Sequence, residues 1–149
     1  MSRRPVQVLG LQELQRQLEQ LPDRMQQNVL RAGNRAVANE LKKEVLNSGG
    51  NVPATVLRAV SAQPNPERMA TKGFLVGLKK PVSKMAHWFE FGTGPREQKT
   101  TGRSTGAMRA TPWLRPALER LRPRVEQIWA RAASRNLALQ LRKMAGRGQ

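Results

Sequence analysis

The chain has 149 residues, 38% of them hydrophobic, which suits one compact domain with a modest core. Lysine and arginine number 27 against 10 acidic residues, so the formal net charge is +17. Such a charge attracts nucleic acid, an anionic membrane surface or an acidic protein. The chain has no cysteine, which excludes disulfides and thiolate metal sites, and no apolar run that could span a membrane.

Two helices are expected at the start of the chain. The first has leucines at helical spacing and ends near Pro22: Leu9, Leu11, Leu14, Leu18 and Leu21. Asp23 should cap the second helix, which ends in the Gly- and Asn-rich segment 47–51. The apolar face of this helix recurs every three or four residues, at Met25, Val29, Ala32, Ala36, Val37, Leu41 and Val45.

The hydrophobic period then changes to two. Alternation over residues 56–62 and again over 74–78 predicts two strands that pair as an antiparallel hairpin. Because two strands alone are only marginally stable, the helices should cover one face, or neighbouring subunits should extend the sheet.

The remainder of the chain is expected to be a short helix, a loop and a long helix. Residues 83–91 form the short helix, and residues 92–111 form a flexible basic loop. In the C-terminal helix, Pro116 fits the first turn and Pro123 should interrupt the helix. Residues 142–149 are expected to fray, and we find no internal repeat. The fold class predicted is therefore α+β, as one domain over residues 1–149.

Catalysis is not indicated. His87 is the one histidine, and we expect it to be a half-buried polar residue without a ligand role. The chain has no nucleophile elbow, no phosphate-binding glycine-rich loop and no cluster of metal ligands. We therefore expect a protein that is not an enzyme and that uses no cofactor.

Nucleic-acid binding is favoured by the charge but not by any motif. Basic helix faces and the basic loop could neutralise phosphates. No zinc finger, helix-turn-helix or aromatic stacking platform is recognisable. Solvated helix faces and salt bridges between subunits explain the same cations equally well, so both interpretations stay open.

Two segments are more specific: His87-Trp88-Phe89-Glu90-Phe91-Gly92-Thr93, and Thr111-Pro112-Trp113-Leu114-Arg115-Pro116-Ala117-Leu118. The chain here resembles the neck or tail-completion proteins of long-tailed bacteriophages and prophages. The resemblance rests on a Glu-Phe-Gly-Thr turn after an aromatic element, followed by a variable loop and then by an aromatic-containing Pro-x-Leu-Arg-Pro-Ala-Leu segment. The opening Leu9-Gly10-Leu11-Gln12-Glu13-Leu14 is similar to the start of that family. Residues 53–58 depart from the family's Thr-Gly-x-Leu element, and the loop between the two blocks is unusually long and basic.

The resemblance implies a structural virion protein at the head–tail junction, assembled in the bacterial host cytoplasm. Its partners would be copies of itself in a ring and the neighbouring neck and tail proteins (tail terminator, head-completion or stopper ring). Contact with the packaged DNA is a further possibility, and no membrane is expected as a partner. The alternative is a basic protein that binds free DNA or RNA. The motif and assembly residues would be Glu90, Phe91, Gly92, Thr93, Pro112, Trp113, Leu114, Arg115 and Pro116.

Each of these residues has an expected physical role. Glu90 should pair with Arg115 or Arg109, and Gly92 should permit a tight bend. Pro112 and Pro116 should hold the entry to the C-terminal helix in a fixed, extended geometry. At least half of the aromatic residues in the two blocks should be core. The candidate contacts for a polyanion or partner are in the loop, which we expect to order on assembly: Arg96, Lys99, Arg103 and Arg109.

Overall fold

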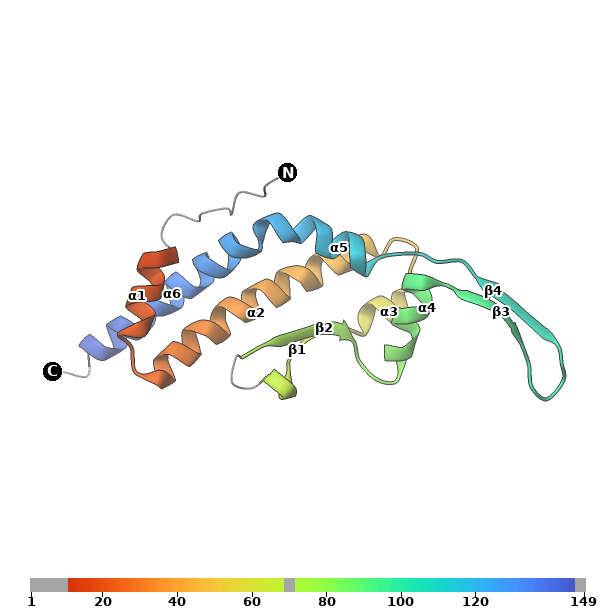
Figure 1. Cartoon of the computed structure of the whole chain (residues 1–149), viewed down its shortest axis with the longest axis horizontal. Coiled ribbons are helices and arrows are strands. Elements are labelled where there is room, and N and C mark those ends of the chain that lie inside the picture. Colours follow the sequence, from red (N-terminus) through yellow and green to blue (C-terminus); the bar gives the residue numbers. More distant parts are fainter. Residues whose placement is uncertain (1–10, 69–71, 147–149) are drawn as a thin grey trace. The chain divides into compact units, whose positions relative to one another are not determined.

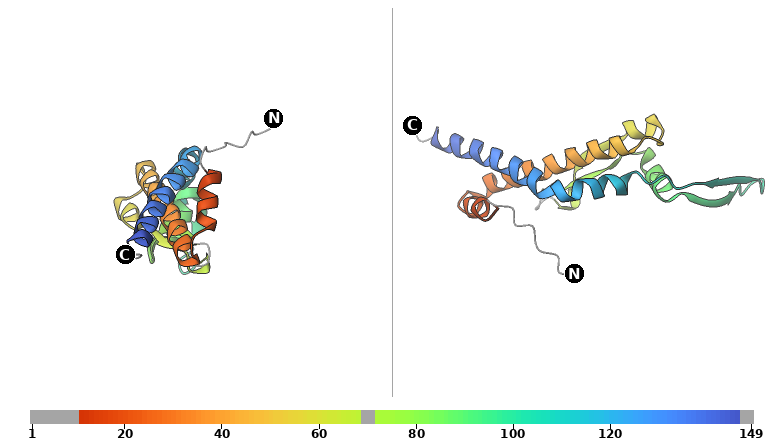
Figure 2. Two further views of the ribbon diagram at one scale, coloured as in Figure 1. Left: turned by 90° about the vertical axis from the view of Figure 1, so that its left-hand side faces the viewer. Right: turned by 90° about the horizontal axis from the view of Figure 1, so that it is seen from above.

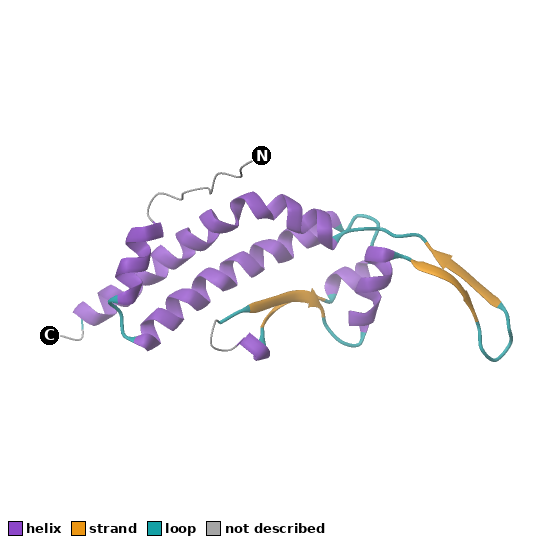
Figure 3. Cartoon of the chain, in the orientation of Figure 1, coloured by secondary structure: helices purple, strands orange, loops and turns teal. Residues whose placement is uncertain are grey.

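The computed structural model describes residues 11–68 and 72–146 (Figures 1 and 3). It has the predicted α+β composition, with N-terminal helices, two small antiparallel sheets and a long C-terminal helix. The chain divides into two compact units. We call one the helical unit (the described residues up to Val37, Pro64–Phe74, and Arg124 onward) and the other the mixed unit (Ala38–Gln63 and Leu75–Pro123). The single-domain assignment stays a prediction.

The helical unit contains α1 (Leu11–Glu19), the first part of α2 (Asp23–Ser48), the short 3-10 helix η1 (Pro66–Arg68) and α6 (Val125–Ala145). α1 packs against α6 (Figure 1). Its core confirms the predicted apolar spacing, since Leu14, Leu21 and Val29 are buried together with Ala133 and Leu137 of α6. Leu9 lies outside the described residues.

A glycine brings α2 and α6 close together. A Cβ atom on Gly33 would lie 2.5 Å from Nε1 of Trp129, so the indole ring rests directly on the α2 backbone. The same indole nitrogen donates a hydrogen bond to Oδ1 of Asn34 at 3.0 Å. The side-chain amide of Asn34 in turn donates to the carbonyl oxygen of Lys72 at 3.2 Å, which ties the loop before β2 to α2.

The start of α2 differs from the prediction in one detail. Asp23 is already helical, and the carbonyl oxygen of Pro22 accepts hydrogen bonds from the amides of Met25 (2.8 Å) and Gln26 (3.1 Å). Pro22 therefore precedes the helix in the capping position, and Asp23 contributes negative charge to the first turn, where the helix dipole favours it. The helix ends at Ser48, inside the predicted segment 47–51.

The mixed unit begins with a correction. The strand predicted over residues 56–62 is instead a short helix, α3 (Ala54–Arg58), followed by β1 (Val60–Pro64). Val52, Val56 and Val60 are all buried, and their spacing of four residues fits a helical turn as well as it fits strand alternation. Pro53 decides between them, because its carbonyl oxygen accepts the amides of Val56 and Leu57 and starts the helix. β2 (Phe74–Leu78) lies where predicted and pairs with β1.

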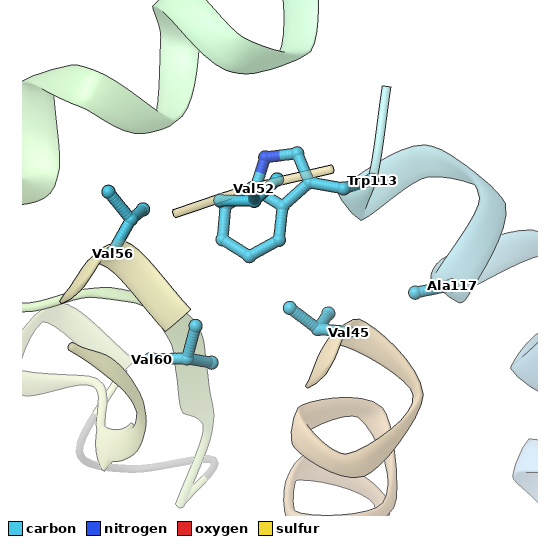
Figure 4. Close-up of a cluster of buried hydrophobic side chains, with 6 residues drawn as sticks. All are labelled: Val45, Val52, Val56, Val60, Trp113 and Ala117. Carbon is cyan, nitrogen blue, oxygen red and sulfur yellow. The ribbon is translucent and has the colours of Figure 1, made fainter. Parts of the chain in front are cut away.

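The core of the mixed unit surrounds one tryptophan. Trp113 is fully buried among residues from α2, α3, β1, α5 and the segment between α2 and α3 (Figure 4). These residues are Val45, Val52, Val56, Val60 and Ala117. Its indole N–H has no hydrogen-bond acceptor among the described residues, so Trp113 contributes through apolar packing.

After β2, η2 (Val82–Lys84) and α4 (Met85–Phe91) confirm the short helix predicted over residues 83–91. The prediction that residues 92–111 form a loop without regular structure is wrong. This segment contains β3 (Thr93–Glu97) and β4 (Ser104–Met108), an antiparallel hairpin that extends away from α4 and α5 (Figures 1 and 2). Gly102 and Gly106 have positive φ angles of 63° and 72°, which L residues rarely adopt. Gly102 lies in the turn of the hairpin, and Gly106 lies opposite Arg96, where the strand register is irregular.

The C-terminal helix is interrupted as predicted. α5 (Leu114–Leu121) is followed by the 3-10 turn η3 (Arg122–Arg124), which contains Pro123, and then by α6. Pro116 lies in the first turn of α5, as expected. Of the tail expected to fray, the residues up to Ala145 are still helical, and residues 147–149 lie outside the description.

Candidate functional site

The two sequence blocks meet at the base of the hairpin. α4 ends at Phe91, the chain crosses β3 and β4, and it returns through Pro112 to the first turn of α5. Segments that are far apart in the sequence therefore lie against each other. We call residues 89–93 and 108–115 together the motif junction.

Glu90 is the centre of the motif junction. It is 8% exposed, which makes it the one buried charged side chain among the described residues. Oε2 accepts the amide N–H groups of Trp113 and Leu114, both at 2.9 Å, and Oε1 accepts that of Arg115 at 3.0 Å. The first amides of a helix have no partner within the helix, so the carboxylate of α4 caps the N-terminus of α5.

This arrangement corrects the predicted ion pair. Glu90 is held by backbone amides, and the guanidinium of Arg115 pairs instead with Glu119 at 3.8 Å on the exposed face of α5. No ion pair joins Glu90 to Arg109 within the described part of the chain, where Arg109 is exposed. A carboxylate at a helix N-terminus is favoured by the helix dipole as well as by the hydrogen bonds.

The environment of Glu90 changes its acidity. Burial is the largest influence and by itself raises the pKa, because it disfavours the charged form. The hydrogen bonds from Trp113, Leu114 and Arg115 favour the carboxylate, and the charge of Arg115 adds to them. Together they hold the pKa of Glu90 below its usual value, so the carboxylate is ionised at neutral pH.

Gly92 forms the predicted bend, and the reason is steric as well as conformational. Its φ angle is +73°, and a Cβ atom there would lie 2.6 Å from the carbonyl oxygen of Met108 and 2.7 Å from the amide nitrogen of Ala110. Both are backbone atoms, which cannot move aside cheaply. Glycine is therefore the residue that lets the two sides of the hairpin base approach each other.

Two further hydrogen bonds close the motif junction. The amide of Thr111 donates to the carbonyl oxygen of Phe89 at 2.7 Å. The amide of Met108 donates to Oγ1 of Thr93 at 3.0 Å. The Glu-Phe-Gly-Thr turn thus supplies a cap, a bend and a side-chain acceptor, and each acts on the segment that contains the second block.

The aromatic residues of the two blocks divide between core and surface, and half of them are core, as expected. Trp113 is buried, and Phe89 packs partly buried against the same core. Trp88 and Phe91 are exposed, by 40% and 69%. His87 is exposed, so the prediction that it is half-buried is wrong, and its ring lies 4.8 Å from that of Phe91.

The predicted cationic contacts are all exposed. Arg96 is in β3, Lys99 and Arg103 flank the hairpin turn, and Arg109 follows β4. None of them is in an ion pair within residues 11–68 and 72–146. The guanidinium of Arg96 lies over the Trp88 ring, 5.7 Å from its centroid, a cation–π contact that links the hairpin to α4.

Sequence reasoning missed one polar contact between α5 and α2. Arg120 pairs with Glu44 at 3.4 Å and also hydrogen-bonds to the hydroxyl of Ser48. Nothing in the spacing of these residues could have indicated it, because the contact depends on how two helices distant in sequence pack. It holds α5 beside the end of α2, next to the buried Trp113.

Other kinds of site find little support in the described residues. A hollow of about 650 Å³ beside β1 and β2 is lined by Ser61, Lys79 and Lys80 among others, but by no carboxylate or histidine. No group of three metal-ligating side chains occurs within the part of the chain that the structure describes. No helix among these residues is long and apolar enough to cross a membrane.

Comparison with protein-family models, with curated proteins and with solved structures found no match to this chain.

Proposed function

We propose that this chain is a structural, non-enzymatic virion protein of a tailed bacteriophage: a ring-forming neck or tail-completion subunit that helps to join the tail to the DNA-filled head. The observation that carries the proposal is the motif junction. The two blocks on which the family resemblance rests, Glu90–Thr93 and Pro112–Pro116, form one hydrogen-bonded structure.

The motif junction supports an element with almost no core of its own. In β3 and β4 every residue is exposed except Thr93 and Met108, at the base, which are partly buried. An isolated two-stranded hairpin is only marginally stable in water, and its edges offer unpaired backbone groups. A hairpin that is anchored this firmly and covered so little is suited to contact a neighbouring subunit.

Exposed aromatic surface lies beside the hairpin. Phe91 is 69% exposed at the end of α4, and Trp88 is 40% exposed under Arg96. Exposed aromatic residues next to arginine are typical of the centres of protein interfaces. We propose that this surface and the hairpin contact the next copy in a ring, through the heterologous patches that cyclic symmetry requires.

The test is a knockout of the gene in the source phage, complemented in trans with tagged protein. We expect the knockout to accumulate separate heads and tails, and immunogold to label the collar of complemented particles. Phe91→Ser should fold but complement poorly, whereas Leu139→Ser, a matched exposed residue of α6, should complement fully. Normal particles in the knockout, with no label on virions, would overturn the proposal.

A second candidate function is the binding of free DNA or RNA. It is favoured by the exposed hairpin cations Arg96, Lys99 and Arg103, which have no ion-pair partner among the described residues. The knockout separates the two candidates, because a protein that acts only on free nucleic acid is not needed to join heads to tails.

A further inference from the structure

A row of arginines runs along the outer face of α6. Arg131, Arg135 and Arg142 are exposed, and their spacings of four and seven residues place them within an arc of about 40° on a helix of 3.6 residues per turn. Arg124, at the N-cap of α6, continues the same line. We call Arg131, Arg135 and Arg142 the α6 stripe.

The α6 stripe is not neutralised within the chain. No carboxylate of the described residues lies within ion-pair distance of its three guanidinium groups. The residues beside it are small or uncharged, such as Gln127, Ser134 and Ala138. The row points away from the packing face of α6, because Ala133 and Leu137 on the opposite side are buried.

We infer that the α6 stripe binds the phosphate backbone of duplex DNA without reading its sequence. At 1.5 Å per residue the stripe spans about 16 Å, over which a duplex presents roughly ten phosphates. Each guanidinium can donate two hydrogen bonds to one phosphate. Small neighbouring side chains such as Ala138 let a rod-like polyanion approach all three arginines at once.

Other partners fit the stripe less well. Single-stranded nucleic acid is usually held by stacking on aromatic rings, and Trp129, the aromatic residue of α6, is turned toward Gly33. The centre of a protein interface is apolar. Of the large apolar side chains exposed on the described part of α6, which are Leu139, Leu141 and Met144, only Leu139 lies within about 60° of the stripe around the helix axis. Duplex DNA needs neither feature.

The chain provides its own matched control. Arg24, Arg31 and Arg35 are exposed on α2 with the same spacing as Arg124, Arg131 and Arg135 on α6. The two long helices thus share this arginine spacing. The α2 row is more obstructed, because Arg31 lines a hollow together with Pro64, the last residue of β1, and Lys72 of the loop before β2.

The experiment measures binding of the full-length protein to a labelled 30-base-pair duplex of arbitrary sequence by fluorescence anisotropy, at several salt concentrations. The variant R131Q/R135Q/R142Q removes the stripe, and R24Q/R31Q/R35Q removes the same charge from α2. Because each phosphate contact contributes about 0.9 to the slope of log affinity against log salt, we expect the α6 variant to lower the slope by roughly two to three. Its affinity for the duplex at low salt should fall 10- to 100-fold. The decrease in log affinity of the α2 variant should be less than a third of the decrease for the α6 variant.

Three results would overturn the inference. One is the absence of duplex binding by the unmodified protein at 50 mM salt. Another is an equal loss of affinity in the two variants, which would mean that binding depends on the net charge of the chain and not on the α6 stripe. The third is displacement of the duplex by polyglutamate at equal charge concentration, which would assign the stripe to an acidic protein. This assay uses isolated protein, so its outcome does not depend on the neck proposal, which the knockout tests separately.

Discussion

The cap that Glu90 provides for α5 can be tested by a change of one atom. In Glu90→Gln one carboxylate oxygen becomes an amide NH2 group, which cannot accept the hydrogen bonds that this oxygen now receives from the backbone of α5. A hydrogen bond to a charged group contributes about 1.5–3 kcal/mol, and loss of a helix cap costs about 0.5–2 kcal/mol. Because the three bonds share one carboxylate, their contributions are not additive, and we expect Glu90→Gln to lower the free energy of unfolding by about 2 kcal/mol.

The effect should depend on pH with a defined sign. The pKa of Glu90 is lowered in the folded chain, so between its folded and unfolded pKa values the folded state binds fewer protons, and stability rises with pH. The contribution of the ionised carboxylate is complete above the unfolded pKa of about 4.3 and is lost as the pH falls through the folded pKa. The difference between the original protein and Glu90→Gln should therefore shrink in acid.

Urea denaturation followed by circular dichroism, at several values between pH 3 and pH 7, measures this difference. Glu119→Gln is the control, because Glu119 is an exposed carboxylate whose ion pair with Arg115 should contribute less than about 0.5 kcal/mol. A Glu90→Gln protein as stable as the original at pH 7, or a difference that stays constant down to pH 3, would refute the capping role.

Three more substitutions test the packing. Gly92→Ala should destabilise by more than the roughly 1–2 kcal/mol that a left-handed residue costs, because its Cβ atom meets the backbone of Met108 and Ala110; urea denaturation would show this. Trp113→Ala should cost about 3–5 kcal/mol, and Trp113→Phe clearly less, because the buried indole N–H has no hydrogen bond to lose; equal losses would contradict this. Gly33→Ala should displace Trp129 and cost about 1–3 kcal/mol, with a change in the near-ultraviolet circular dichroism spectrum.

The helices were predictable from the sequence because their signals are local and repeated. The leucines of α1, the apolar face of α2 and the interruption at Pro123 each follow from spacing or from the chemistry of proline. Residues 56–58, which lie in α3, were predicted wrongly as part of a strand. Residues four apart, such as Val52, Val56 and Val60, lie on one face of a strand and also, nearly, on one face of a helix, so this spacing does not distinguish the two. A proline carbonyl that accepts the first helical amides is not recognisable as such in a pattern of apolar residues.

The motif junction was predictable only in part. The sequence indicated that Glu90 needs a partner, and the excess of arginine suggested a guanidinium. The partners are the backbone amides at the N-terminus of α5, from Trp113 to Arg115, which lie 23 to 25 residues later in the chain. Capping motifs recognised from sequence are local, with the capping residue directly before its helix, so a cap supplied from another helix leaves no spacing signal. The exposed hairpin was missed for a related reason, because its glycines and threonines suit a turn and a loop equally well.

The shared pattern of α2 and α6 links the packing of the helical unit to its charge. On each helix the arginines lie about 180° around the axis from a small residue, Gly33 on α2 and Ala133 on α6, since nine residues of helix turn through two and a half turns. The small residues are buried, and the helices run in opposite directions within this unit (Figures 1 and 2). Close packing through small residues therefore directs the two arginine rows away from each other, which keeps like charges apart in a strongly basic chain and leaves the α6 stripe open to a polyanion.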